Sequence, residues 1–165
     1  TNSELVTAVN EWVSNSTNAT AKYGNINNWN TSNVTSMIDL FKGKSAFNSN
    51  ISGWNTAKVT NMHSMFEGAH AFNQNISGWN TAKVKDMFYT FYGARAFNQN
   101  IGGWNVSNVT TMRAMFRDAR KFNQNISGWN VSKLSNMVGM FMFTKRICAI
   151  CQTVYTNINR TWTIK

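Results

Sequence analysis

Proline is missing from all 165 residues of this chain. Because proline removes a backbone donor and interrupts regular elements, its absence suits a continuous stack of short elements without forced breaks. Long apolar runs are missing as well. A membrane-spanning helix needs a run of about 18 or more apolar residues, and none is present, so the sequence predicts no membrane span.

Acidic residues are scarce: six Asp and Glu stand against 16 Lys and Arg, which gives a formal net charge of +10. Such an excess favours acidic partners, namely nucleic acid, anionic lipid, polyanionic glycan or an acidic protein surface. Many small polar positions hold Asn where Asp would fit equally well. The net positive charge therefore has a second interpretation: it reflects a shortage of acidic residues and not a basic binding site.

Only two cysteines are present, Cys148 and Cys151, in a Cys-x-x-Cys pattern. A zinc site needs four ligands, and the two histidines, His63 and His70, lie in one distant repeat. No thioredoxin-like pattern surrounds the pair. We therefore expect small buried cap residues or a local disulfide, with an intermolecular disulfide as the alternative, and we predict no metal and no cofactor.

A catalytic constellation is also missing. The acids within the repeats fall at differing repeat positions and are Asp39, Glu67, Asp86 and Asp118. No spacing supports a Ser-His-Asp set, and neither a phosphate-binding glycine loop nor a metal motif occurs. We therefore expect that the protein is not an enzyme.

What the sequence does contain is a 25-residue repeat, written five times over residues 22–146. Four clear copies open with Phe-Asn-x-Asn-Ile-x-Gly-Trp-Asn, and a worn copy begins at Lys22. The clear copies begin at Phe47, Phe72, Phe97 and Phe122. A period in this range is typical of a repeat solenoid whose units stack on their neighbours. Residues 1–21 and 147–165 are the expected N-terminal and C-terminal caps.

Five apolar columns recur once per copy, and a side chain that recurs once per coil stacks on its own copy. Together the Ile, Trp, Val, Met and Phe columns can fill a narrow tube, and each large side chain buried contributes roughly 1.5–3 kcal/mol. The predicted core residues of the second and third copies are Ile51, Trp54, Val59, Met62, Phe66, Ile76, Trp79, Val84, Met87 and Phe91.

Local patterns predict the elements of each coil. Residues 58–62 and their equivalents have a β-branched centre and alternation, which predicts one short parallel strand per coil. Residues 64–69 favour a helical or 3-10 turn. Residues 3–14 show helical apolar spacing behind a capping box, which predicts an amphipathic capping helix, and residues 14–23 are expected to be a polar connector. The expected fold class is thus an α/β repeat solenoid.

Two asparagine columns are expected to be structural. At the corner of a coil, an Asn amide can bond backbone groups and tie its own coil to the next. The first column includes Asn50, Asn75, Asn100 and Asn125. The second includes Asn55, Asn80, Asn105 and Asn130.

Basic columns form the candidate binding face. One column holds Lys58, Lys83 and Lys133. The other holds Arg95, Arg120 and Lys145, with Lys121 and Arg146 beside it. Strands of neighbouring coils lie about 4.8 Å apart, so like charges repel unless water or an anion screens them. A solvated face is one interpretation, and a linear acidic partner is the other. Nucleic acid is disfavoured, because the Trp column is needed inside and no exposed aromatics are evident for base stacking.

The phrase Phe-Asn-Gln-Asn-Ile-Ser-Gly-Trp-Asn, followed by Val-Thr-x-Met and Met-Phe-x-Gly-Ala, resembles a known repeat family. It is similar to the BspA-like leucine-rich repeat surface proteins, also called the DUF285 or mycoplasma-lipoprotein-type repeat, over residues 22–146. The resemblance implies a leucine-rich-repeat-like fold and a role in adhesion or protein binding. Asn55, Asn61, Asn75 and Asn80 stand where that family commonly has Asp, and the pattern fails after Arg146.

Three functions remain open. The first is a non-enzymatic scaffold that acts as a surface-exposed protein-binding or structural module, with an acidic protein surface as partner. The second, which the resemblance implies because the family occurs in large DNA viruses, is a virion structural protein such as a minor capsid or cement protein that docks on capsid subunits. The third is a polyanion- or glycan-binding module. The expected location is extracellular, at the cell surface, or in a virion.

Overall fold

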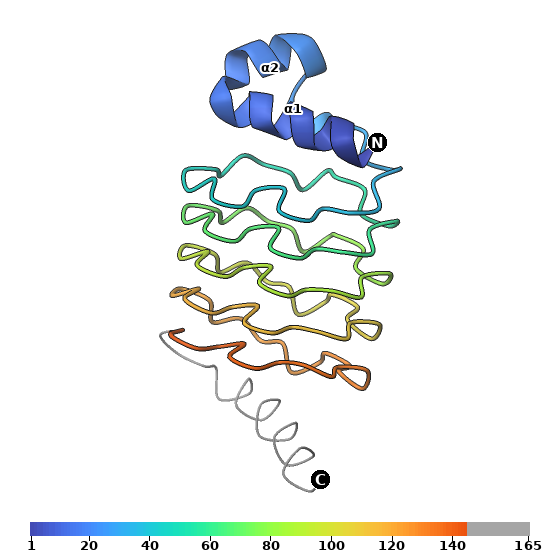
Figure 1. The fold of residues 1–165 in the computed structure, drawn as a ribbon, viewed down its shortest axis with the longest axis vertical. Helices are drawn as coiled ribbons and strands as arrows, with labels where there is room; N and C mark the ends of the chain where they lie inside the picture. The colour runs from blue at the N-terminus through green and yellow to red at the C-terminus, as the bar shows by residue number, and fades with distance from the viewer. Residues whose placement is uncertain (145–165) are drawn as a thin grey trace, which may run out of the picture.

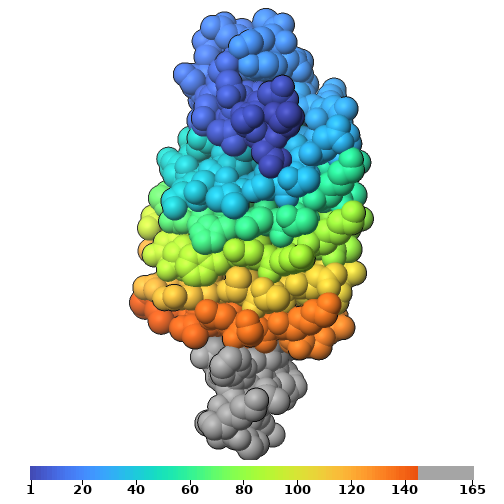
Figure 2. Space-filling view, turned by 45° about the vertical axis from the view of Figure 1, so that its right-hand side comes forward, coloured from blue at the N-terminus to red at the C-terminus, as the bar shows by residue number. Residues whose placement is uncertain are grey.

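The structure is a computed structural model that describes residues 1–144. Two helices, α1 (Asn2–Ser14) and α2 (Ser16–Tyr23), lie at one end, and the repeats follow as coils stacked along the long axis (Figure 1). A short 3-10 turn, η1 (Ile26–Asn28), opens the first coil. We number the coils 1 to 5 by residues 24–46, 47–71, 72–96, 97–121 and 122–144. Figure 2 shows the coils as successive bands below the helices.

Helix α1 begins at the expected capping box, in which the Thr1 hydroxyl accepts a hydrogen bond from the Glu4 amide at 3.3 Å. Its apolar side buries Leu5 and Val9 against coil 1, and Trp12 meets Trp29 edge to face with ring centroids 5.8 Å apart. The helix thus covers the apolar end of the stack. No helix within residues 1–144 is long and apolar enough to cross a membrane.

The polar connector predicted over residues 14–23 is wrong, because residues 16–23 form α2. Asn15 caps this helix by accepting a hydrogen bond from the Asn18 amide at 3.0 Å. Lys22 then pairs with Glu11 of α1 at 2.9 Å. The cap signal was present in the sequence, and the contact with α1 stabilises a helix whose own apolar face is short.

The predicted strand in each coil is also wrong, and with it the assignment to a leucine-rich-repeat-like α/β class with one strand per coil. Within residues 1–144 no strand forms. The only pairing of this type is one isolated parallel bridge between consecutive coils, at Ser36↔Asn61, Asn61↔Asp86, Asp86↔Thr111 and Thr111↔Asn136.

Backbone geometry explains the missing strand. After the bridge residue of coil 2, alternate amides donate to carbonyl oxygens of coil 3 at 2.7–3.0 Å. The amides between them bond within their own coil, His63 to the Asn61 side chain and Met65 and Glu67 to carbonyl oxygens three residues back. Ser64 and Gly68 have φ values of 51° and 68°, which an extended strand does not allow. Only every second amide therefore joins the coils, and a continuous ladder cannot form. The helical turn expected over residues 64–69 is wrong for the same reason.

A tryptophan column links each coil to the one before it. The indole N–H of Trp79 donates to the carbonyl oxygen of Ile51 at 3.2 Å, and Trp79 stacks on Trp54 with centroids 6.5 Å apart and planes 4° apart. The same bond recurs from Trp104 to Ile76 at 3.1 Å. A buried indole N–H needs an acceptor, and the repeat supplies one from the neighbouring coil.

Phenylalanines fill the rest of the interior. Phe66 stacks on Phe91 of the next coil, with ring centroids 5.4 Å apart, and on Phe72 at the start of that coil, with ring centroids 4.0 Å apart. Offset stacks of this kind add about 0.5–1.5 kcal/mol per pair to the burial of the rings. Each of the ten predicted core residues of the second and third copies is buried, with no more than 4% of its surface exposed.

The predicted asparagine columns do not tie the coils together. All eight side chains are exposed, and each accepts a hydrogen bond from the amide two residues later in its own coil, as Asn55 does from Ala57 at 3.0 Å. These are local Asx turns. A different column makes the ties, since the Asn73 amide donates to the Asn48 side chain at 2.9 Å and the Asn98 amide donates to Asn73 at 2.9 Å.

We predict that Trp79→Phe lowers the free energy of unfolding by about 1–3 kcal/mol, because the Ile51 carbonyl oxygen is then buried without its donor. The matched control is Trp29→Phe, whose indole bonds the exposed Gly24 carbonyl at 3.1 Å. That carbonyl can turn to water, so the control should lose less than about 1 kcal/mol. Urea unfolding followed by circular dichroism measures both, and equal losses would contradict the role of the buried bond.

Candidate functional site

Three of the 25 repeat positions hold a different residue in every one of the five copies, whereas the other positions repeat at least one residue. We call these three columns the variable face. The first column is Ile38, His63, Phe88, Arg113 and Val138. The second is Asp39, Ser64, Tyr89, Ala114 and Gly139. The third is Lys42, Glu67, Tyr92, Arg117 and Met142.

The first column forms a mixed stack across coils 2 to 4. His63 lies on Phe88 with ring centroids 4.7 Å apart and planes 30° apart, and the Arg113 guanidinium lies over Phe88 at 5.7 Å. Phe88 is half-buried. Neighbours in the same column therefore already contact the Phe88 ring.

The other two columns extend this aromatic cluster sideways. Tyr89 packs on Phe88 at 3.9 Å and approaches Tyr92 at 5.0 Å. Arg117 lies over the Tyr92 ring at 5.7 Å and over the Phe143 ring at 5.5 Å. Side chains from coils 3, 4 and 5 thus meet in one patch of aromatic rings and guanidinium groups.

Two bulky residues at this patch have strained backbones. Tyr89 has a φ of 56° and Phe143 a φ of 63°, a region that large side chains rarely adopt. The position of Phe143 holds Gly43 and Gly68 in coils 1 and 2, with φ values of 70° and 68°. Phe143 is nevertheless 67% exposed, so burial does not compensate for the strain. The same two positions have positive φ in every coil, for example at Ser64 and Asp118, so the turn geometry of the repeat imposes this conformation on the side chains that stand there.

Charge on the variable face differs between its two halves. In coils 1 and 2, Lys42 pairs with Glu67 at 3.1 Å and with Asp39 at 3.5 Å, and the Glu67 carboxylate raises the pKa of Lys42 above its usual value. In coil 4, neither Arg113 nor Arg117 forms an ion pair with any carboxylate of residues 1–144. The half over coils 3 to 5 is therefore cationic.

The predicted lysine column stands at a corner of the coils, apart from the variable face. Lys58 donates to Asn33 at 2.7 Å, and Lys133 donates to Asn108 at 2.6 Å. Asparagine side chains of the preceding coils thus hold two of these exposed lysines. Lys83 is exposed in the same column. Residues 59–69 separate this corner from the arginine column within coil 2.

The predicted arginine column has a partner within the chain. Arg95 and Arg120 both bond the carboxylate of Asp118, at 3.1 and 2.7 Å. The hydrogen bond from Arg120, and then that from Arg95, lowers the pKa of Asp118 below its usual value. This pairing stabilises the fold above the ordinary carboxyl pKa and is lost as the pH falls through the lowered value. Lys121 is exposed beside it.

Several predicted features lie outside the described residues. They are Lys145, Arg146, the pair Cys148 and Cys151, and the cap expected over residues 147–165. Within residues 1–144, no group of three His, Cys, Asp or Glu side chains is placed to hold a metal ion.

A hollow of about 530 Å³ joins the variable face to the arginine column. It is lined by Tyr92, Arg117, Asp118, Arg120, Phe143 and Thr144. Such a hollow can receive a side chain of a partner between an aromatic ring and two guanidinium groups.

These aromatic and arginine residues are absent from the predicted binding face, and the sequence was expected to show no exposed aromatics suited to base stacking. Ranking columns by what the copies share selects residues that the stack itself requires. The signal for Phe88, Tyr89 and Tyr92 is the opposite one, a difference between copies at fixed positions. Surface variation on a constant scaffold is typical of recognition.

Comparison with known proteins supports one relationship. A family model described as "Mycoplasma protein of unknown function, DUF285" matches residues 7–112 and 81–156. No curated protein and no solved structure matches the chain.

The strain at Phe143 makes a stability prediction. We expect Phe143→Gly to leave the free energy of unfolding unchanged or to raise it by up to about 1 kcal/mol, because glycine adopts a positive φ without a Cβ clash. The converse variant is Gly93→Ala at a φ of 67°, whose Cβ would meet Gly68 only at an ordinary 3.7 Å. It should lose about 1–2 kcal/mol through backbone strain alone. Thermal and urea unfolding measure both variants, and destabilisation by Phe143→Gly would show that its ring holds the fold.

Proposed function

The chain belongs to the DUF285 family, and we propose that it is a non-enzymatic, surface-exposed binding module whose variable face holds an acidic segment of a protein partner. The observation that carries this proposal is the placement of the three variable columns. Members of these columns contact one another as one cluster across coils 2 to 4, and Phe143 of coil 5 lies beside it against Arg117.

Binding accounts for the variation better than folding does. The stack needs the same Trp, Ile, Met and Phe in each coil, because each contacts its own copy in the next. The stack places no such demand on the first and third variable columns, which are not buried and in which, for example, Phe88, Arg113 and Val138 occupy equivalent positions. A broad and irregular surface on a regular scaffold suits recognition of another macromolecule.

The chemistry of the cationic half favours a protein partner. Tyrosine and arginine are enriched among the residues that carry most of the energy of protein interfaces. Arg113 and Arg117 are held over Phe88 and Tyr92, so their orientation is partly fixed before binding, while their N–H groups keep no carboxylate partner within residues 1–144. An acidic segment would supply carboxylates to these donors and apolar groups to the ring edges.

The same geometry argues against a nucleic acid. Single-stranded nucleic acids bind by stacking bases on open aromatic faces. His63, Tyr89 and Arg113 already pack against the Phe88 ring, and Arg117 lies over Tyr92. A base could stack here only after displacing these neighbours.

Selection of peptides on the intact chain tests the proposal. A displayed library of random 12-residue peptides would be selected on the immobilised protein, and one enriched peptide would be synthesised for titration calorimetry. We expect enriched peptides to combine Asp or Glu with aliphatic or aromatic residues. Arg113→Ala/Arg117→Ala should weaken binding of the peptide by at least about tenfold, which is about 1.4 kcal/mol.

The matched control is Lys83→Ala/Lys133→Ala, which removes the same formal charge from the lysine column at the corner of the coils. Binding of the peptide to this variant should change by less than about twofold. Equal losses in the two double variants, with steep salt dependence and retention on heparin, would indicate diffuse attraction to polyanions. That result would replace the proposed function with polyanion binding.

A further inference from the structure

The edge of coil 1 that faces the helices is only partly closed. In the deeper coils, the Ala71 amide donates to the Ser45 carbonyl oxygen at 2.9 Å, and the Asn73 amide donates to the Asn48 side chain at 2.9 Å. The equivalent pair recurs one coil further on, at 3.0 and 2.9 Å. These two amides are therefore a standard attachment point of each coil to the coil before it.

The same two donors occur where coil 1 ends and coil 2 begins, and no coil precedes this stretch. They are the amides of Ala46 and Asn48, and neither has a hydrogen-bond acceptor within residues 1–144. The donors stand two residues apart on one run, so they are directed to the same side. By the repeat, that side is the one from which a preceding coil would come, and it is here occupied by the helices.

Elsewhere on this edge, the helical cap replaces the missing coil. The Asn2 side chain accepts hydrogen bonds from the Thr35 amide at 3.0 Å and the Ser36 amide at 3.4 Å. At the other end, the Trp12 indole donates to the Ser49 hydroxyl at 2.9 Å. The cap thus supplies acceptors at one end of the edge and a closing contact at the other, but it leaves residues 46–48 open.

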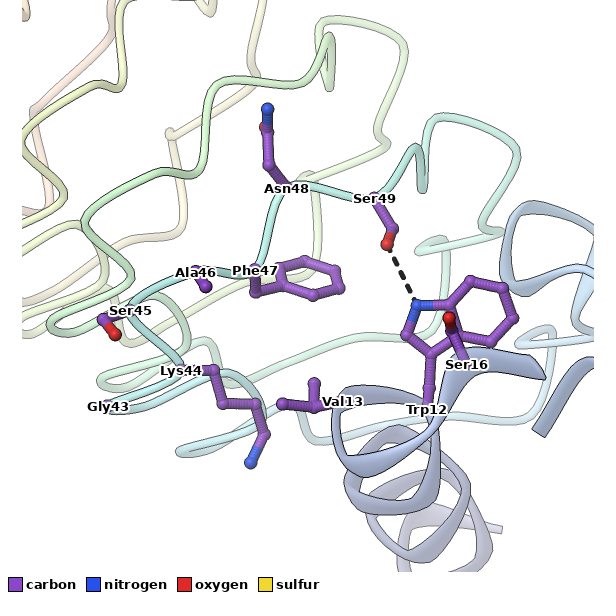
Figure 3. Close-up of a pocket in the computed structure, with 10 residues that line it drawn as sticks. All are labelled: Trp12, Val13, Ser16, Gly43, Lys44, Ser45, Ala46, Phe47, Asn48 and Ser49. Atoms are coloured by element: carbon purple, nitrogen blue, oxygen red, sulfur yellow. Dashed lines mark hydrogen bonds between the residues drawn. The ribbon is translucent and has the colours of Figure 1, made fainter. Parts of the chain in front are cut away.

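A groove lies along this open stretch. It has a volume of about 430 Å³, with Trp12, Val13 and Ser16 on the helical side and residues 43–49 on the coil side. Figure 3 shows the Phe47 ring pointing toward Trp12, with Val13 between Lys44 and Trp12. Phe47 itself is only 5% exposed, whereas Val13 is 42% exposed. The groove therefore combines an apolar helical wall with two free backbone donors.

We infer that this groove binds a short extended peptide segment. The peptide would supply two oxygen acceptors to the amides of Ala46 and Asn48, in place of those that a preceding coil would provide. An extended chain is the ligand class that matches donors two residues apart along one edge. Its small or aliphatic side chain would pack on Val13. This site is separate from the variable face, and it rests on different residues from the proposed function.

The deeper coils define the probe. At each attachment point the acceptors come from the equivalent run of the preceding coil, and the first such run is Ser-Ala-Phe-Asn at residues 45–48. The probe is an acetylated and amidated peptide, Gly-Lys-Ser-Ala-Ala-Asn-Ser-Asn, which copies residues 43–50 with alanine in place of Phe47. The alanine avoids placing a second ring beside the covered Phe47 ring.

Titration of this peptide into the ¹⁵N-labelled full chain tests the inference by nuclear magnetic resonance. We expect saturable shifts of the Ala46 and Asn48 amide signals, with the amides of Ala71 and Asn73 unchanged because they already have acceptors. Val13→Lys should weaken binding by at least about tenfold. The matched control is Val6→Lys, since Val6 lies on the same helix, is also 42% exposed and does not line the groove.

Two outcomes would overturn the inference. The first is an absence of shifts at Ala46 and Asn48 in a folded chain, or equal weakening by Val13→Lys and Val6→Lys. The second is movement of the same two signals with protein concentration in the absence of peptide, which would assign the groove to a second copy of the chain.

Discussion

The structure depends on register, because each residue must meet its own counterpart in the next coil. A single coil encloses no core, so its stability comes from contacts with its neighbours. Those contacts are the alternate backbone amides, the indole bond that joins Trp79 to Ile51, and the stacked rings of Phe66 and Phe91. A shift by one residue would break all three at once, and this explains why so many positions repeat.

Register also determines which positions are free to vary and which ends need a cap. No side chain of the first and third variable columns is buried, so five different residues fit at each of these positions where the interior accepts one. At the first coil, no predecessor exists, and Asn2 and Trp12 of α1 bond groups along its edge. A helix cannot reproduce the full set of acceptors of a coil, because its own carbonyl oxygens are bonded within the helix. The open amides of Ala46 and Asn48 follow from this mismatch.

Prediction from the sequence succeeds where one residue type implies one environment. Recurring Trp and Ile residues indicated burial, and Trp54 and Ile51 are buried. It failed where backbone conformation decides. The segment at residues 58–62 has the composition of a strand, yet the positive φ at Ser64 and Gly68 turns the chain directly afterwards. A strand-like composition indicates that the side chains suit a half-buried pleated surface. It does not indicate which backbone amides find hydrogen-bond acceptors.

By itself, then, the sequence determined the 25-residue period, the apolar columns and the capping box of α1, because these depend on residue type and spacing along the chain. Only the tertiary structure decided which polar groups meet. It gave the exposed asparagines to local turns, paired Arg95 and Arg120 with Asp118, and left Arg113 and Arg117 over aromatic rings. The partner of a polar group is decided by distance and direction in space. From the sequence alone, several partners are equally plausible for each such group.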